Sequence, residues 1–457
     1  MSTPFVDHAR NAEAFVADEA RAHWHDEALW FVRQKRDRAA KAVPEWEALR
    51  KEAEAIKAHT VAHLGYYLDR FAERAEANGI EVYWAEDAEE HNAIVARLLA
   101  EAGATRVVKS KSMLTEECGL NPYLEARGVE VTDTDLGERI VQLAGDHPSH
   151  IVLPAIHMKK EDVARIFAQT LRTDPANTDP GYLTRAARRH LREKFLAADA
   201  AITGVNFALA EEGAITVCTN EGNADLGTAL PKLHIACMGL EKVIPSAKDL
   251  GVFTRLLARS ATGQAITTYT SHFRRPEPGR RLCVVIVDNG RSRLLKSRHA
   301  KTLSCIRCGA CMNTCPVYRR SGGHSYGYVI PGPIGSALAG AREPERYASL
   351  PFACSLCASC DAVCPVRIDL HAQLYREREK TITVPRYAGK RRGLHLAAWI
   401  LLRPRLYRIL MGVLRGVWPR LPRPLIYNRF NTWGRDREMP TPAKESFESM
   451  LRKRRGR

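Results

Sequence analysis

Eight cysteines between residues 305 and 365 constrain this chain more than any other feature. The phrase C-x2-C-x2-C-x3-C-P occurs twice, and each cysteine of the second copy follows its counterpart by 49 positions. Three thiolates at this spacing can bind one face of an iron–sulfur cubane from a single loop, because iron prefers soft sulfur ligands. The repeated phrase is typical of domains that hold two [4Fe–4S] clusters. We therefore expect two such clusters here.

The spacing also predicts which cysteines bind which cluster. In two-cluster domains the fourth cysteine, which precedes a proline, follows the chain away from its own loop and ligates the other cluster. The first cluster is expected to bind Cys305, Cys308, Cys311 and Cys364, and the second to bind Cys354, Cys357, Cys360 and Cys315. Beyond these cluster ligands, the sequence assigns no catalytic and no cofactor-binding residue.

Two other uses of cysteine fit the pattern less well. Structural zinc takes separated C-x2-C pairs rather than a triplet followed by Cys-Pro. Disulfides are disfavoured, since no secretory signal opens the chain and 457 residues need no covalent staples. Clusters can also be purely structural, but two that share ligands along the chain favour electron transfer.

Four regions follow one another along the chain. Residues 1–75 are rich in Ala, Glu, Arg and Lys and predict two or three amphipathic helices. Residues 76–300 alternate strand-like and helix-like segments, which indicates βαβ units and a parallel sheet. Residues 301–379 hold the cysteines among short helices, and residues 380–457 form a basic helical tail. The predicted fold class is an α/β domain, then an α-helical dicluster ferredoxin domain and the tail.

The α/β region gives the most detailed expectations. Strand-like runs occur at 80–84, 105–108, 129–132, 151–154, 200–203, 214–219, 233–237, 265–270 and 282–288. Helix-like segments occur at 90–102, 112–126, 136–143, 160–172, 183–198 and 246–260. Polar stretches follow several of these strands, where open α/β sheets bind their ligands. Neither nucleotide-binding glycine fingerprint is present among them, so no nucleotide cofactor is predicted.

The positive charge of the chain is concentrated in the tail. The chain carries a net charge of +17, and residues 380–457 contain 20 Lys or Arg against 4 Asp or Glu. This composition suits peripheral contact with an anionic membrane surface or with an acidic partner. A helix folded back on the chain's own domains is an equal alternative. No nucleic acid is expected, because no binding motif accompanies the charge. No segment is long and apolar enough to cross a membrane, so a cytoplasmic protein, with membrane association as an option, is expected.

The chain as a whole resembles the lactate-utilisation iron–sulfur protein family, the B component of a bacterial three-protein L-lactate oxidation system. The resemblance extends from about residue 40 to Trp433-Gly-Arg435. The resembling phrases are Val43–Trp46, Val108–Met113, Thr134–Glu138, Pro148–Ile151, Pro154–His157, Ile202–Asn206, Thr219–Asn223, Asp288–Arg291, Cys305–Cys311, Gly322–His324 and Pro331–Gly335. At Glu211-Glu-Gly-Ala214 the chain departs from the Thr-Gly-Ser-like phrase expected of the family.

The resemblance implies a function and a fold. Residues 76–300 would share the fold of sugar-phosphate isomerases and coenzyme A transferases. The chain would take part in oxidation of L-lactate to pyruvate, relaying electrons through its clusters to or from other subunits of a lactate-oxidising complex. The alternative is an enzyme in its own right that acts on a small carboxylic acid or acyl thioester, with Lys109, Lys111, His157 and Glu221 as candidates.

Overall fold

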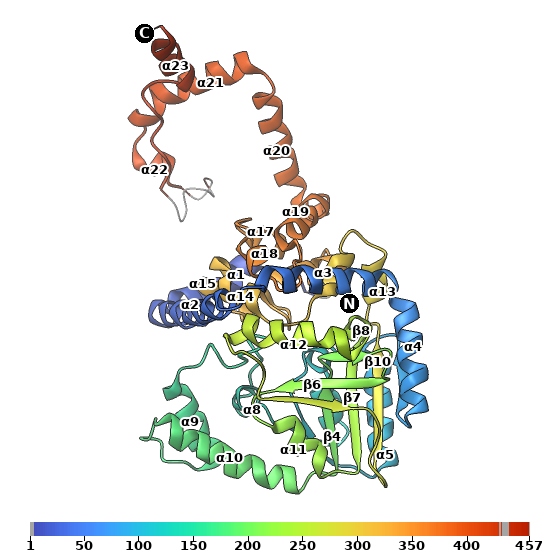
Figure 1. The fold of residues 1–457 in the computed structure, drawn as a ribbon. Helices are drawn as coiled ribbons and strands as arrows, with labels where there is room; N and C mark the ends of the chain where they lie inside the picture. Colours follow the sequence, from blue (N-terminus) through green and yellow to red (C-terminus); the bar gives the residue numbers. More distant parts are fainter. Residues whose placement is uncertain (1–3, 429–430, 432–437, 457) are drawn as a thin grey trace. The chain divides into compact units, whose positions relative to one another are not determined.

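Six parallel strands form the centre of the α/β domain, in the order β1-β10-β7-β4-β2-β3 (Figure 1). The structure is a computed structural model that describes residues 4–428, 431 and 438–456. The strands are β1 (Glu81–Ala85), β2 (Arg106–Lys109), β3 (Glu130–Asp133), β4 (Ala200–Gly204), β7 (Leu233–Gly239) and β10 (Arg281–Val287). Six of the predicted strand-like runs fall on them, so the expected parallel sheet is confirmed.

Both faces of this sheet are buried, as a parallel sheet requires. Along β7, Ile235 and Cys237 point into one apolar core and Ala236 and Met238 into another. The helices that enclose the sheet include α4 (Leu64–Ala77), α5 (Ala88–Glu101), α6 (Met113–Glu117), α7 (Leu120–Glu125), α8 (Leu136–Leu143), α9 (Lys160–Leu171), α10 (Pro180–Leu196) and α11 (Asn223–Ala229). The strands therefore end at a common carboxyl edge between two layers of covering structure.

A second, four-stranded sheet packs beside the first, in the order β8-β5-β6-β9. Its strands are β5 (Phe207–Leu209), β6 (Ala214–Thr219), β8 (Val243–Ile244) and β9 (Tyr269–Phe273). The predicted runs at 214–219 and 265–270 belong to this sheet, and the latter strand starts later than expected. The phrase Glu211–Ala214 forms the turn between β5 and β6, where Gly213 has a φ of 58°.

Two expectations for the α/β region are wrong. The apolar run at 151–154 is not a strand but part of a bent segment that lies at the carboxyl edge of the large sheet. The helix expected at 112–126 is divided into α6 and α7, because Gly119 between them has a left-handed φ of 63°. Hydrophobic character alone did not separate a buried strand from a buried loop.

The N-terminal region holds four helices rather than two or three: α1 (His8–Ala17), α2 (Glu19–Lys41), α3 (Trp46–Ala62) and α4. The predicted break near Val43–Trp46 separates α2 from α3. Helix α2 packs on α12 (Ala247–Thr262) and also on α14 (Ala310–Thr314) and α15 (Pro316–Ser321) of the cysteine region (Figure 1). The first helices of the chain thus help to enclose its cysteines.

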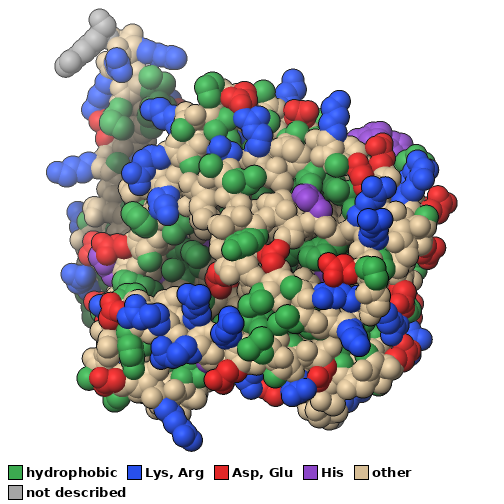
Figure 2. Space-filling view, turned by 60° about the horizontal axis from the view of Figure 1, so that its bottom comes forward, with side chains coloured by type: hydrophobic (Ala, Val, Ile, Leu, Met, Phe, Trp, Pro, Cys, Tyr) green, Lys and Arg blue, Asp and Glu red, His purple; other side chains and the backbone are tan. Residues whose placement is uncertain are grey.

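The cysteine region is helical, as expected. After α13 (Arg291–Leu295) and the 3-10 turn η2 (Ala300–Ser304) it contains α14, α15, η3 (His324–Tyr326), α16 (Gly332–Arg342), α17 (Leu350–Ala353), α18 (Ser359–Val363) and α19 (Leu370–Thr381). It packs with the α/β domain and the N-terminal helices into one unit that ends at Thr381. On the face of this unit seen in Figure 2, basic and acidic side chains are interspersed.

Residues from Ile382 onward form a second unit of amphipathic helices: η4 (Pro385–Tyr387), α20 (Ala388–Leu401), α21 (Pro404–Val417), η5 (Trp418–Arg420), α22 (Arg423–Ile426) and α23 (Phe447–Arg455). None of the described residues in this unit is buried, and several large apolar side chains such as Leu402 and Ile409 are exposed. Trp433 and Arg435 of the family-like phrase lie outside the described residues. Within the described part of the chain, no helix has the length and apolarity needed to span a membrane.

Candidate iron–sulfur centres and an adjoining cavity

The two cysteine phrases fold into matching loops. Arg307 and Gly309 of the first loop have positive φ angles of 60° and 75°, and their counterparts Leu356 and Ala358 have 56° and 57°. The short helices α14 and α18 follow at the same offset. In each loop the residue two positions after the first cysteine donates its backbone N–H to that cysteine's Sγ, at 3.4 Å in the first loop and 3.2 Å in the second. Such donors stabilise a thiolate.

Four cysteines, three from the first phrase and one from the second, line one small cavity. They are Cys305, Cys308, Cys311 and Cys364, and apolar side chains form the rest of the wall. Burial raises the pKa of Cys364 to about 11 and also raises the pKa of Cys308 and Cys311, where neighbouring thiols add to the effect. Soft thiol ligands whose deprotonation needs a compensating cation fit a [4Fe–4S] cluster.

The remaining four cysteines also influence one another. Burial raises the pKa of Cys315 to about 11, and Cys354 and Cys357 contribute to the rise. The pKa of Cys360 is raised by burial and by Asp361, and then by Cys315 and Cys354. Cys315 of the first phrase and the triplet of the second phrase are thus within electrostatic reach of one another.

Two buried arginines of the N-terminal helices reach the same region. Arg36 on α2 donates to the carbonyl oxygen of Val363 at 3.1 Å, and Arg50 on α3 donates twice to that of Cys364, at 3.0 and 2.9 Å. These carbonyl groups end α18, where a helix attracts positive charge. The sequence pattern of α2 and α3 gave no sign of this role.

A much larger cavity, with a volume of about 560 Å³, opens at the carboxyl edge of the parallel sheet. Its lining unites polar stretches that are far apart in the sequence. Lys111 follows β2, Asp135 follows β3, Asn206 follows β4, Glu221 precedes α11 and Lys242 follows β7. Ligands of open α/β sheets bind at this edge. The stretches that hold Lys111, Asp135 and Glu221 were expected there, whereas Lys242 was not.

One side of the cavity carries a coupled group of charges. Lys111 Nζ donates to Asp135 Oδ2 at 2.6 Å and to the carbonyl oxygen of Val152 at 3.1 Å. Glu221 Oε2 accepts a hydrogen bond from the backbone N–H of Leu136 at 3.0 Å. Burial, and next to it the charge of Asp135, raises the pKa of Glu221. Lys111 and Glu221 are therefore both placed to meet a molecule in the cavity.

The cavity also borders the first cysteine loop. Cys308 and Arg307 belong to the cavity wall together with Lys242. Arg307 Nη2 lies 3.4 Å from a carboxylate oxygen of Glu241, whereas its buried Nη1 has no hydrogen-bond partner among the described residues. Lys242 Nζ forms no hydrogen bond or ion pair with the described part of the chain, and burial lowers its pKa to about 8. Sequence reasoning missed both cations.

Lys109 has a different role from the one considered for it. Its side chain is fully buried, with Nζ 2.7 Å from Asp133, 3.1 Å from Glu116 and 4.0 Å from Glu138. Burial opposes the charge, but these carboxylates outweigh burial and raise the pKa of Lys109. It does not line the large cavity, so it supports the sheet edge from within.

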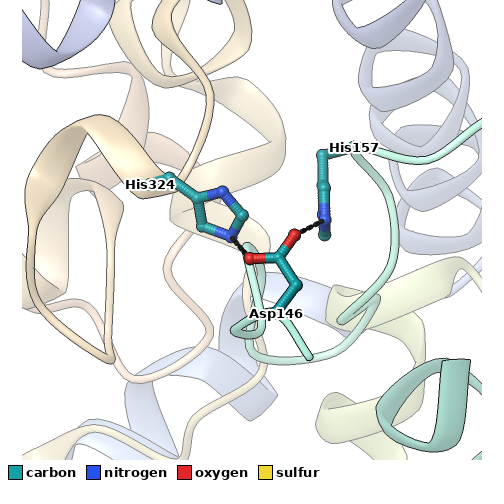
Figure 3. Close-up of side chains that lie close together, drawn as sticks. All are labelled: Asp146, His157 and His324. Carbon is teal, nitrogen blue, oxygen red and sulfur yellow. Dashed lines mark hydrogen bonds and ion pairs between the residues drawn. The ribbon is translucent and has the colours of Figure 1, made fainter. Parts of the chain in front are cut away.

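His157 lies in a separate cluster with Asp146 and His324 (Figure 3). Its Nε2 is 3.1 Å from Asp146 Oδ2, and its Nδ1 is 2.6 Å from Ser149 Oγ. His324 Nε2 is 3.9 Å from Asp146 Oδ1 and only 2.7 Å from the carbonyl oxygen of His147. The cluster joins the 146–157 segment to the loop between the cysteine phrases. Of the four enzyme candidates, only Lys111 and Glu221 line the large cavity.

Two family models match successive parts of the chain. A LUD domain matches residues 68–292, and a 4Fe-4S dicluster domain matches residues 301–368. The second match includes all eight cysteines of the repeated phrase. The prediction of two [4Fe–4S] clusters is therefore confirmed at the level of the domain.

Curated proteins match nearly the whole chain. "Lactate utilization protein B" of Shouchella clausii (strain KSM-K16) is 42% identical over 439 residues, covering 91% of this chain and 90% of that protein. The protein of the same name in Geobacillus thermodenitrificans (strain NG80-2) is 42% identical over 428 residues, covering 90% and 89%. The "Uncharacterized electron transport protein YkgF" of Escherichia coli (strain K12) is 40% identical over 425 residues, covering 89% and 88%. At this identity and coverage, the chain belongs to the lactate utilization protein B family.

Proposed function

We propose that this protein is an iron–sulfur electron-transfer subunit that takes part in the oxidation of L-lactate to pyruvate. The observation that carries the proposal is a dicluster domain that contains all eight cysteines of the repeated phrase, next to an α/β domain with a large cavity. The names of the relatives, lactate utilization and electron transport, agree with this function. Other subunits of a lactate-oxidising system are its expected partners.

The proposed ligands are crossed between the two phrases. Cys364 shares a cavity with the first triplet, which supports Cys305, Cys308, Cys311 and Cys364 as one set. The electrostatic influence of Cys354 and Cys357 on Cys315 supports Cys354, Cys357, Cys360 and Cys315 as the other.

The chemistry of lactate explains the need for two clusters. Oxidation of L-lactate to pyruvate releases two electrons and two protons, and a [4Fe–4S] cluster carries one electron at a time. Two clusters held by the eight cysteines would supply two one-electron acceptors for these electrons. The residues of this chain contribute the thiolate ligands, the N–H donors to sulfur and the buried arginines behind them.

Iron content and magnetic resonance test the proposal. The full chain, isolated without oxygen from cells supplied with iron, is expected to hold about eight irons. Reduction should produce two EPR signals that interact, because the helices that follow the two cysteine loops, α14 and α18, pack against each other. A content near four irons, or clusters that no physiological reductant reduces, would contradict the proposal.

An enzyme in its own right is the second candidate, and Lys111 and Glu221 in the cavity favour it. A simple experiment distinguishes the two functions. L-lactate added to the oxidised, isolated chain should bleach its visible absorption only if this chain oxidises lactate by itself. Bleaching that requires the partner proteins supports the electron-transfer function.

The helices of the second unit add binding to a membrane surface to the proposal. Its exposed apolar side chains alternate with Arg403, Arg405, Arg408 and Arg415, and α21 is strongly amphipathic. A positively charged amphipathic helix binds at the interface of an anionic membrane. We infer that residues 380–457 bring the protein to such a surface.

A further inference from the structure

The large cavity and the first cysteine loop share a wall. Arg307 and Cys308 stand side by side in the loop, and both line the cavity, whereas neither Leu356 nor Cys357 of the second loop does so. A molecule held in this cavity therefore lies against the first set of cysteines. The repeated loops differ at this point, since the arginine of the first loop is replaced by leucine in the second.

Two cations in the wall beside this loop, Lys242 and Arg307, keep N–H groups that have no hydrogen-bond partner among the described residues. Other buried cations nearby are paired: Arg291 lies 2.6 Å from Glu241, and Lys57 donates to the Glu241 carbonyl oxygen at 2.6 Å. The carboxylate of Glu241 thus forms ion pairs with Arg291 and Arg307 but not with its neighbour Lys242. The half-buried Lys242 lines the cavity and has no hydrogen-bond partner among the described residues, so its ammonium is free to bind an anion there.

The rest of the cavity suggests the kind of molecule that it accepts. Apolar side chains such as Met113, Ile151 and Leu257 line its middle, and amides such as Asn206 and Gln264 contribute hydrogen-bonding groups. Pockets for small organic ligands have volumes of about 300–1,000 Å³ and this same mixture of apolar wall and few polar groups. At about 560 Å³, the cavity has room for more than a three-carbon acid.

We infer that this cavity is the electron-entry site of the protein, where a redox-active organic anion binds with Lys242 and Arg307 as its anchors, next to the first set of cysteines. The inference rests on the proposed function for the direction of electron flow, but the binding site stands on the geometry alone. The anionic group is the carboxylate of a 2-hydroxy acid or the phosphate of a flavin nucleotide.

A 2-hydroxy acid and a reduced flavin release the same number of electrons. A 2-hydroxy acid that becomes a 2-oxo acid loses two electrons and two protons, and a reduced flavin that becomes oxidised also loses two electrons. Two clusters held by the eight cysteines would accept one electron each, and the protons would pass to solvent. The cavity needs no further oxidant for one turnover.

Binding measurements on the full chain with its clusters test the site. The probes are oxamate, a carboxylate analogue of the 2-oxo acid that a 2-hydroxy acid yields on oxidation, and flavin mononucleotide, each titrated calorimetrically to about 1 mM. Binding of oxamate alone identifies the carboxylate form, and binding of flavin mononucleotide alone identifies the phosphate form. If neither probe binds, the inference is overturned.

Lys242 is the decisive residue. The variant Lys242→Met keeps the length of the side chain and is expected to weaken binding of the active probe at least about tenfold, or 1.4 kcal/mol. Lys242→Arg should retain binding. Lys248→Met is the matched control, because Lys248 is exposed on α12 and does not line the cavity. Unchanged affinity in Lys242→Met, with iron content and circular dichroism like those of the wild type, would disprove the anchor.

A spectroscopic readout separates this inference from the proposed function. The probe should change the EPR signal of one cluster in the reduced protein, and this change should be absent in Lys242→Met. Clusters that are reduced in the presence of lactate and the partner proteins, without any probe binding, would leave the function standing and remove the site. Probe binding without such reduction would support the binding site and contradict the proposed function.

Discussion

Arg50 on α3 donates two hydrogen bonds to the carbonyl oxygen of Cys364, at 3.0 and 2.9 Å, although the two residues are 314 positions apart in the sequence. The guanidinium also donates to the carbonyl oxygen of Asp361 at 3.2 Å. It is largely buried, with 8% of its surface exposed. One side chain thus holds the end of α18 beside the proposed first cluster.

Replacing Arg50 by methionine is expected to destabilise the protein. The change leaves two buried carbonyl oxygens without these charged donors, which costs about 1–3 kcal/mol. Urea unfolding of the protein with its clusters measures the loss. Lys51→Met is the control, since Lys51 is exposed on the same helix and should change the free energy of unfolding by less than about 0.5 kcal/mol. Equal stability of the two variants would contradict the structural role of Arg50.

Replacing Cys315 by serine tests the crossed ligation. If Cys315 binds the second cluster, the variant should lose or alter that cluster while the cluster held by Cys305, Cys308 and Cys311 persists. Iron content should fall to about half, and one of two EPR signals should remain. Cys283→Ser is the control, because Cys283 is a buried thiol of β10 outside the cysteine region. Loss of the first cluster alone would show that the ligands are not crossed.

Replacing Lys109 by methionine should be strongly destabilising. Asp133, Glu116 and Glu138 would remain around the site without their cation, and breaking a buried ion pair in this way costs about 3–5 kcal/mol. Thermal or urea unfolding measures the effect. Lys194→Met removes a more exposed pair with Glu130 and is expected to cost less than about 1 kcal/mol. A small effect of Lys109→Met would point back to a role in binding.

Acid should destabilise the fold through its buried histidines. His234 on β7 accepts or donates a 2.8 Å hydrogen bond with Thr203 Oγ1, and burial lowers its pKa from 6.5 to about 3. Because this pKa is depressed in the folded state, the unfolded chain binds more protons between these values. The contribution of neutral His234 to the free energy of unfolding is complete above pH 6.5 and is lost as the pH falls towards 3. Between pH 7.5 and 5.5 the loss is about 1.4 kcal/mol.

Unfolding at these two pH values, compared between the wild type and His234→Gln, measures this contribution. Glutamine does not titrate, so the difference between the two pH values should shrink by about 1.4 kcal/mol. The residual dependence comes from groups such as His8 and His157, whose pKa values burial lowers to about 4. An unchanged pH difference in the variant would contradict the buried, neutral state of His234.

Removal of residues 382–457 tests the membrane surface. The shortened chain should keep its clusters, because the first unit ends at Thr381. The full chain should sediment with vesicles containing anionic lipid, less so at high salt, and the shortened chain should not. Vesicles of neutral lipid are the control. Equal sedimentation of both chains would assign membrane binding to another part of the protein or exclude it.

The sequence predicted the features that depend on local spacing. The repeated phrase implied two similar loops, and the structure places left-handed residues at the same offsets in both, Arg307 and Leu356 among them. The alternation of apolar strands and amphipathic helices located the parallel sheet for the same reason. The strands β5 and β8 were missed because three and two residues are too few to establish a period.

The cavity residues show where sequence reasoning ends. Lys111 and Glu221 could be proposed because they follow strands or precede helices. Lys242 could not be proposed from the sequence. It lacks an ion pair among the described residues because the carboxylate of its neighbour Glu241 pairs with Arg291 and Arg307 instead. The only sequence signal for Arg307 is its replacement by leucine in the second phrase. Such features depend on which partners the fold brings together, and these partners are distant in the chain.

The packing of α2 and α3 against the cysteine region has a consequence for synthesis of the protein. The helices that leave the ribosome first make contacts with residues translated about 300 positions later, as the 314-residue separation of Arg50 and Cys364 illustrates. At bacterial rates of 5–20 residues per second, roughly 15–60 s pass between synthesis of these helices and synthesis of the residues that they contact. Metal loading of the second half of the chain must come later still. The newly made protein therefore passes through a stage in which its N-terminal helices lack the contacts that they make with the cysteine region in the folded chain.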